Sequence, residues 1–592
     1  MKKSWKLIIG IIVLLVVVSI TIDKIAANMA NKQLRKIQEQ FSGQYDFSYE
    51  KLNVRLLKKD IVLKNFKFFS IVDSSHSHNK FDFELDKLHL HLDGYFNLVL
   101  DGTLDISKIE IIKPKVSYGL KKHDSNTDVK SQIQDSTIAV NDAGEKFLKF
   151  LKVEEFVLED GNADIYRLED PDMKIFYVDD LDIIISDINL DFENDSIFEK
   201  TKVSNFDLSA SNVYNNDLEN HKLSIGNISY SLASKGFAVN NLHVKNKQDP
   251  SIYNSKIKYR SPWISVDVEK IEFDIYPWEI FKNGVFDLGV ISLTKPNVEL
   301  FIDLNKALNP KIKPMPSRII RDIPIDFNID SIQLVDATFV FKAKSKGEKP
   351  GMLKISPING NLTNITNTPD LLDENPIMKL DVETKLWDEG IVDLEIEVDI
   401  NDINDKMHVD GKMINMPFVK AENMIKNMFG VEVTSGYIDL LEFQFDATDV
   451  YSEGKVVLNY HDLVLDLKKK DKSDKSTDDK QFKEKSNHFI NFAVHGAIIK
   501  DNIPGDKKYT PVGYIMRERI RDKAFADAIW GSIQDGIFDI IIIDALYNSK
   551  NKYKKQIKKE QKAEEKSKKK EDKPNSKNEK HKLKLFNKKK SK

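Results

Sequence analysis

The sequence predicts a mainly β protein with a single N-terminal transmembrane helix, an extended antiparallel sheet built from repeats, a few short helices and a disordered basic tail. Three observations lead to this fold class. A strand–turn–strand phrase occurs twice, apolar residues recur with a period of two over most of the chain, and one uncharged apolar segment lies near the N-terminus. A period of two is typical of strands with one dry face and one wet face.

The repeat is the most specific of these signals. Residues Gly102–Val116 align without a gap on Gly284–Val298, and both segments end in Lys-Pro-x-Val. A repeated strand–turn–strand unit indicates a sheet built by stacking modules. The flanking matches are Leu85–Leu92 with Val268–Ile275, and Phe156–Asp160 with Ile332–Asp336. The apolar positions that these matches pair are Leu88, Leu90 and Leu92 with Ile271, Phe273 and Ile275, and Ile109 and Ile111 with Ile291 and Leu293.

The clearest single strand is Val392–Ile400, in which Leu394, Ile396 and Val398 alternate with acidic residues. Only Pro417–Met428 and Tyr514–Tyr547 show helical spacing in the later part of the chain. So few helices leave two ways to cover the apolar strand faces: the sheet folds onto itself, or something outside the sheet covers it.

The apolar segment at the N-terminus runs from Leu7 to Ile22 without a charge. With Trp5 and a snorkelling Lys6, about 18 residues are available, which is close to the minimum for a helical membrane span. The flanking lysines predict a cytoplasmic N-terminus and export of everything after Asp23. A cleaved signal peptide is the competing interpretation.

These signals divide the chain into a cytoplasmic stub and anchor (1–24), a juxtamembrane helix (25–42), a repeated β region (43–505), an amphipathic helical region (506–549) and a Lys-rich disordered tail (550–592). The β region holds the repeat copies near 81–170 and 262–342 and a polar loop at 468–487. The tail carries 20 Lys and 6 acidic residues, a charge of +14, so the remainder carries about −17 of the total of −3. An acidic body argues against nucleic acid as a partner.

No known catalytic or phosphate-binding motif occurs, and the absence of cysteine excludes thiol chemistry. His89 and His91 lie two apart on an expected strand, where they could share a metal ion. The second copy has Glu272 and Asp274 at these positions, which favours the polar face of a sheet. The sequence therefore predicts no enzyme activity, no catalytic residue, no metal site and no cofactor.

Several features of the chain carry a family resemblance: the anchor, the segment Val54–Phe66, the two Lys-Pro-x-Val phrases and the later blocks Ser435–Phe445 and Gly454–Leu463. Together they resemble the AsmA-like family of envelope proteins. That family is related in architecture to TamB and to the bridge-like lipid transfer proteins. The resemblance implies an elongated, curled sheet in the periplasm, with an apolar inner groove and a role in phospholipid movement between inner and outer membranes. The Lys-rich tail departs from the family pattern.

Under this resemblance the groove would hold lipid acyl chains, and the partners would be phospholipids, the inner membrane through the N-terminal helix, and an anionic outer-membrane surface or an envelope protein through the tail. The alternative from the residues alone is a closed β core that serves as an envelope scaffold. The candidate groove residues are Leu88, Leu90, Leu92, Ile109, Ile111, Ile271, Phe273, Ile275, Ile291, Leu293, Leu394, Ile396 and Val398.

Overall fold

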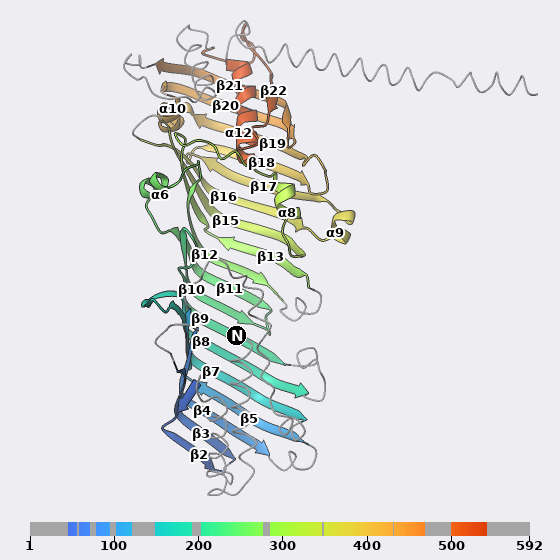
Figure 1. Cartoon of the computed structure of the whole chain (residues 1–592). Coiled ribbons are helices and arrows are strands. Elements are labelled where there is room, and N and C mark those ends of the chain that lie inside the picture. Colours follow the sequence, from blue (N-terminus) through green and yellow to red (C-terminus); the bar gives the residue numbers. More distant parts are fainter. Residues whose placement is uncertain are drawn as a thin grey trace, which may run out of the picture. The chain divides into compact units, whose positions relative to one another are not determined.

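The computed structural model describes residues 45–55, 59–71, 79–94, 102–120, 149–191, 203–275, 284–345, 349–429, 431–467 and 499–541. Over these residues the protein is mainly β, as predicted, with a large mixed sheet and a few short helices (Figure 1). The chain divides into two compact units. The N-terminal unit comprises residues up to 302 with 324–341 and 357–368, and the C-terminal unit comprises 303–323, 342–356 and the residues from 369 onward.

Most strands of the N-terminal unit are 9 to 22 residues long and pair with their neighbours in a continuous ladder (Figure 1). Strands β15 and β16 contribute residues to both units. The elements are β1 (Tyr45–Ser48), β2 (Lys51–Arg55), β3 (Asp60–Ser70), β4 (Lys80–Gly94), β5 (Thr103–Ile112), β6 (Lys115–Leu120), β7 (Phe150–Arg167), β8 (Asp170–Asp191), β9 (Asn205–Asn215), β10 (His221–Ser231), β11 (Gly236–Asn246), α6 (Pro250–Lys256), β12 (Trp263–Asp274), β13 (Phe286–Thr294), β14 (Asn297–Asp303), β15 (Phe327–Lys344) and β16 (Gly351–Thr366).

The C-terminal unit contains an antiparallel ladder from β17 to β22 and most of the described helices. Its elements are α8 (Pro316–Arg321), α9 (Pro369–Glu374), β17 (Ile377–Leu386), β18 (Gly390–Asp399), β19 (Met407–Pro417), a 3-10 turn (Phe418–Ala421), α10 (Glu422–Phe429), β20 (Val431–Ala447), β21 (Tyr451–Leu467), β22 (Gly513–Glu518) and α12 (Phe525–Ile541).

The two sequence copies form the same supersecondary unit, which confirms the repeat. In the first copy β4 pairs with β5 and β6, and in the second copy β12 pairs with β13 and β14. The next strand then runs parallel to the first half of this pair: β7 beside β5, and β15 beside β13. The expectation of a purely antiparallel sheet is therefore wrong, because each copy returns through a crossover and adds a parallel strand.

A line of bends crosses the N-terminal unit, and we call it the crease. At the crease each of eight non-glycine residues has a positive φ, between 47° and 56°, and an exposed side chain. Six of the eight are Asn or Asp, the types that tolerate the left-handed conformation best after glycine. The residues are Asn65, Lys113, Asp160, Asp180, Asn212, Asn241, Lys295 and Asp336.

The crease explains the repeated Lys-Pro phrase. Lys113 and Lys295 each interrupt a strand, and their backbone N–H groups donate to Glu159 and Val335, both at 2.8 Å. The following proline has no N–H, so the interruption leaves no unpaired donor there. Across the crease the apolar positions shift by one residue along the strand, as between Val239 and Leu242 on either side of Asn241 in β11. One extra residue per strand therefore keeps the apolar side chains on one face.

A substitution at the crease tests this account. We expect Asn241→Val to lower the free energy of unfolding by about 1–2 kcal/mol, because a β-branched side chain is strained at a φ of 54°. Asn241→Gly at the same exposed position should cost far less, since glycine adopts this conformation freely. Urea unfolding of both variants measures the difference. Equal destabilisation by Val and Gly would show that the Asn side chain, not the backbone, matters.

The sequence predicts two helices in the C-terminal part of the chain, and the structure agrees with one of them fully and with the other in part. The expected helix at Pro417–Met428 is confirmed by the 3-10 turn and α10. The expected helix at Tyr514–Tyr547 is wrong at its start, since Gly513–Glu518 forms β22, where Ile515 is fully buried beside Gly454 of β21. Only Phe525–Ile541 is helical among the described residues of that region.

The anchor residues Trp5, Leu7 and Ile22, the juxtamembrane helix 25–42, the loop 468–487 and the tail 550–592 lie outside the described residues. Within the described part of the chain, no helix combines the length and the apolar composition that a membrane span requires.

Candidate functional site

One face of the N-terminal unit carries apolar side chains from strand to strand, and we call it the apolar face. Residues paired across neighbouring strands project to the same side of a sheet. The pairing therefore defines a row of apolar residues that crosses eleven strands. The row consists of Leu63 (β3), Leu88 (β4), Ile111 (β5), Leu158 (β7), Ile183 (β8), Leu208 (β9), Tyr230 (β10), Phe237 (β11), Phe273 (β12), Ile291 (β13) and Ile332 (β15).

Adjacent rows widen this face. One of them crosses the first copy and another crosses the second. On each strand, their members lie two residues away from the member of the eleven-strand row. Their members are Ile61, Leu90, Ile109, Phe156, Ile185 and Phe206 in the first case, and Ile228, Val239, Ile271, Leu293 and Leu334 in the second. The face is thus several side chains wide and contains no charged residue in these rows.

The first copy lies at a closed end of the apolar face. Its candidate residues belong to a buried cluster that β1, β2 and β3 complete, with Leu90 fully buried and Phe47, Phe66 and Phe68 packed nearby. All five candidates of this copy are at most 7% exposed: Leu88, Leu90, Leu92, Ile109 and Ile111. Here the sheet forms an ordinary dry core.

The second copy lies where the same face is open. All five of its candidates are half-buried: Ile271, Phe273, Ile275, Ile291 and Leu293. Phe273 stacks on Phe237 of β11, with 4.8 Å between ring centroids. Ile275 follows the end of β12, where its carbonyl accepts a hydrogen bond from the Tyr230 hydroxyl at 3.3 Å. The structure thus gives equivalent positions of one repeat two different environments.

The C-terminal unit has an apolar face of its own. Leu394 and Ile396 of β18 are half-buried, whereas Val398 is 3% exposed. The rows that contain the first two continue through Val409 and Phe443 toward β21 and β22. The row through Ile396 consists of Leu380, Ile396, Val409, Phe445, Gly454 and Ile515. The row through Leu394 consists of Val382, Leu394, Gly411, Phe443, Val456 and Gly513.

Helix α12 covers the end of that face. A Cβ placed on Gly536 would lie 2.2 Å from Val456 Cγ2 and 3.1 Å from Ile515 Cγ1, so the helix backbone rests directly on β21 and β22. Ile533, Ile540 and Ile541 are buried, whereas Trp530 is 51% exposed. This helix therefore packs on the end of the sheet of the C-terminal unit.

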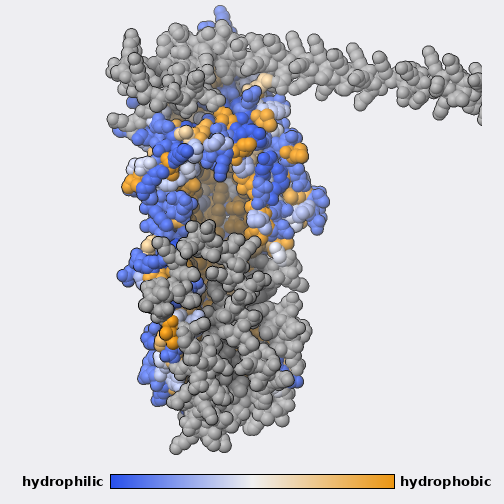
Figure 2. Space-filling model, viewed as in Figure 1, coloured by the Kyte–Doolittle hydropathy of each residue, from blue (hydrophilic) through white to orange (hydrophobic). Residues whose placement is uncertain are grey.

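Figure 2 shows a recess in the upper half of the view, at the level where Figure 1 places β17. Its floor is hydrophobic and its rims are mainly hydrophilic. The half-buried residues of β17 and β18 fit such a floor, because their charged neighbours Asp381, Glu383 and Asp393 are exposed on the other face of the strands. An apolar surface that remains open to solvent marks a binding surface more often than a packing defect.

Sequence reasoning missed the middle of the apolar face. Strands β9 to β11 supply Leu208, Tyr230, Phe237 and Val239, and none of these was a candidate. Their signal is present in the sequence as two short period-two runs offset by one residue, such as Phe237 and Val239 followed by Leu242 and Val244. A strict period-two search breaks at the crease and discards such strands.

No protein-family model matches the chain, and no curated protein matches its sequence.

Proposed function

We propose that this chain is a non-enzymatic carrier that holds the acyl chains of lipids on its open apolar face and supports phospholipid transport between membranes. The observation that carries this proposal is that the apolar rows are half-buried in β9–β13 of the N-terminal unit, apart from the buried Tyr230, and in β17 and β18 of the C-terminal unit. Water-exposed apolar surface of this extent is costly unless a ligand covers it.

The dimensions of the open face suit a lipid. Strands lie about 4.8 Å apart, so the row from β8 to β13 extends about 24 Å. An acyl chain spans about 15 Å, which is half of the ~30 Å hydrocarbon core of a bilayer. Each buried CH₂ group contributes about 0.8 kcal/mol, so a chain laid along the row binds without any sequence-specific contact. This mode of binding requires no catalytic residue and accepts many lipids.

The cellular context we propose follows the AsmA-like resemblance. The segment Leu7–Ile22 anchors the chain in the inner membrane with its N-terminus in the cytoplasm, and the bulk lies in the periplasm, elongated and curled around the apolar groove. The tail 550–592, with its charge of +14, binds an anionic surface of the outer membrane or an envelope protein.

A second candidate function, an envelope scaffold with a closed β core, is favoured by one observation. The first repeat copy and the sheet beneath α12 are dry and well packed, as a structural protein requires. This description fits those two regions but not the half-buried rows between β9 and β13.

Site-specific photo-crosslinking in cells tests the lipid proposal. We expect p-benzoylphenylalanine at Phe273, within the open apolar face, to form ultraviolet-dependent adducts that carry lipid phosphate. The same probe at Glu272, the next residue on the opposite and exposed face of β12, should form none. This neighbour is a matched control because it lies one residue away in the same strand and differs in the face to which it projects.

The result at further positions decides between the two functions. Adducts at Phe237 and Leu394 as well as at Phe273 would extend lipid occupancy to both units. If a folded protein yields lipid adducts at none of these positions, the carrier proposal fails and the scaffold remains.

A further inference from the structure

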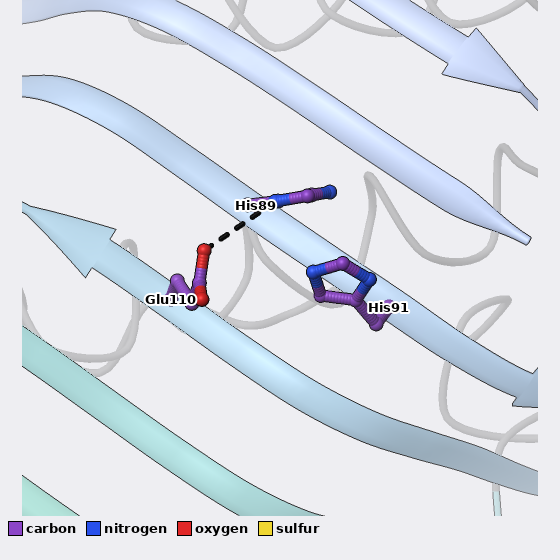
Figure 3. Close-up of side chains that lie close together, drawn as sticks. All are labelled: His89, His91 and Glu110. Atoms are coloured by element: carbon purple, nitrogen blue, oxygen red, sulfur yellow. Dashed lines mark ion pairs between the residues drawn. The ribbon is translucent and has the colours of Figure 1, made fainter.

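Two histidines and a glutamate gather on the face of the first copy opposite to its buried core (Figure 3). His89 and His91 project from β4, and Glu110 projects from β5 directly opposite His89. One ligand atom from each residue lies within 4.8 Å of the other two. His89 Nδ1 is 3.4 Å from Glu110 Oε2, and the two imidazole rings have centroids 3.7 Å apart.

The His89 side chain is only 14% exposed, although it lies on the polar face of the sheet. Both of its ring nitrogens are buried and have no hydrogen-bond partner. The buried residues Val62 and Val157 flank the His89–Glu110 pair in the same cross-strand row, which keeps water away. Buried polar atoms are normally paired, so two unpaired nitrogens in one ring require an explanation.

The charged groups around the pair are balanced. Glu110 accepts from Lys87 and Lys108, each at 3.3 Å, and Lys108 also pairs with Glu155 at 3.1 Å. Asp60 faces His89 Nε2 at 3.8 Å and forms an ion pair with Arg55. Burial, the neighbouring His91 ring and the Lys87 ammonium lower the pKa of His89.

The second repeat copy shows that the fold itself does not need these residues. The corresponding row there contains Ala238, Glu272, Ser292 and Gln333, and Glu272 is exposed. Of the two copies, only the first therefore carries histidines at these positions. The sequence comparison of the two copies favoured a plain polar face, but it could not show the burial of His89 or the place of Glu110.

We propose that His89, His91 and Glu110 bind a divalent transition-metal ion, with zinc as the best match. Two imidazoles and a carboxylate are ligands that zinc takes in proteins, with bonds of about 2.0–2.2 Å. Tetrahedral bonds of this length place ligand atoms about 3.4 Å apart, so small side-chain rotations would bring the three ligand atoms to the distances that a zinc ion requires. Asp60 is placed to accept the second ring N–H of His89, as carboxylates do around metal-bound histidines.

Titration of the full-length protein with zinc chloride tests this site. We expect saturation at one zinc ion per chain, and a loss of affinity of at least 100-fold in the double variant His89→Gln/His91→Gln. Glu110→Gln should abolish the visible absorption of the cobalt-substituted protein, which reports the ligand set. Asp60→Asn should weaken binding by about 10- to 100-fold through the orientation of His89.

A matched control is Glu272→Gln/Asp274→Asn, the same pair of positions in the second copy, which should leave binding unchanged. His243 and His408 each pair with one carboxylate and His461 with two, and the Gln variants of these three residues should also have no effect. Circular dichroism checks that each variant is folded. Unchanged zinc binding by folded His89→Gln/His91→Gln, or no binding by the unmodified protein, would overturn the proposal.

Discussion

Replacing Leu90 by glutamate is expected to prevent the N-terminal unit from folding, whereas the same change at Phe273 should leave it folded and weaken lipid binding. The two residues occupy equivalent positions in the repeat and differ in burial. Leu90 is fully buried between Ile61 and Ile109, where an unpaired carboxylate costs several kcal/mol. Phe273 is half-buried, so a carboxylate there keeps contact with water.

The effect on lipid follows from the cost of a charge in hydrocarbon. An acidic residue facing acyl chains costs about 2.5–3.5 kcal/mol, which corresponds to a loss of affinity on the order of 100-fold. Lipid retained by the purified full-length chain, measured by mass spectrometry, should therefore fall to background in Phe273→Glu. Urea unfolding of the same preparation shows whether the fold is retained.

The control for this comparison is Glu272→Gln, which changes a charge on the opposite face of β12 and should alter neither lipid nor stability. Two outcomes contradict the account. If Phe273→Glu unfolds as readily as Leu90→Glu, the second copy is a closed core like the first. If it stays folded and keeps its lipid, the lipid lies elsewhere on the chain.

Local sequence patterns could predict the strands and the repeat, but not how the strands join. The phrase Gly102–Val116 reads as strand–turn–strand, but β5 and β6, which it spans, do not pair with each other and instead lie side by side along β4. The parallel partner β7 follows a long connection in the sequence. The local alternation of Phe156 and Leu158 does not predict beside which strand of the sheet β7 pairs. The crease could have been predicted from the sequence, because the apolar positions shift by one residue wherever a strand crosses it.

The difference between closed and open parts of the apolar face lies beyond the local sequence. Leu90 and Phe273 occur in almost the same phrase, yet only the first has the aromatic residues of β1 and β3 beside it. Burial is a property of the neighbours that topology supplies. For the same reason the candidate metal ligand Glu110 was missed, since its place opposite His89 depends on the register of β4 and β5.

The second large effect concerns α12, where replacing Gly536 by alanine should destabilise the C-terminal unit. Helix propensity alone predicts the opposite sign, because alanine is favoured over glycine by about 1 kcal/mol in a helix interior. The added Cβ would lie 2.2 Å from Val456 Cγ2, and such overpacking costs about 1–3 kcal/mol. Gly536→Val should cost more than Gly536→Ala, since it adds further atoms at the same contact.

Urea unfolding measures these changes, and Ala526→Val on the exposed side of α12 is the control. That change should cost no more than about 0.7 kcal/mol, the range of ordinary helix propensities. Because α12 covers Val456 and Ile515, its displacement should also uncover the apolar face at β21 and β22 and increase the binding of a hydrophobic dye. Stabilisation by Gly536→Ala would show that α12 does not rest on the sheet, and the end of the C-terminal unit's own apolar face would then be open to lipid as well.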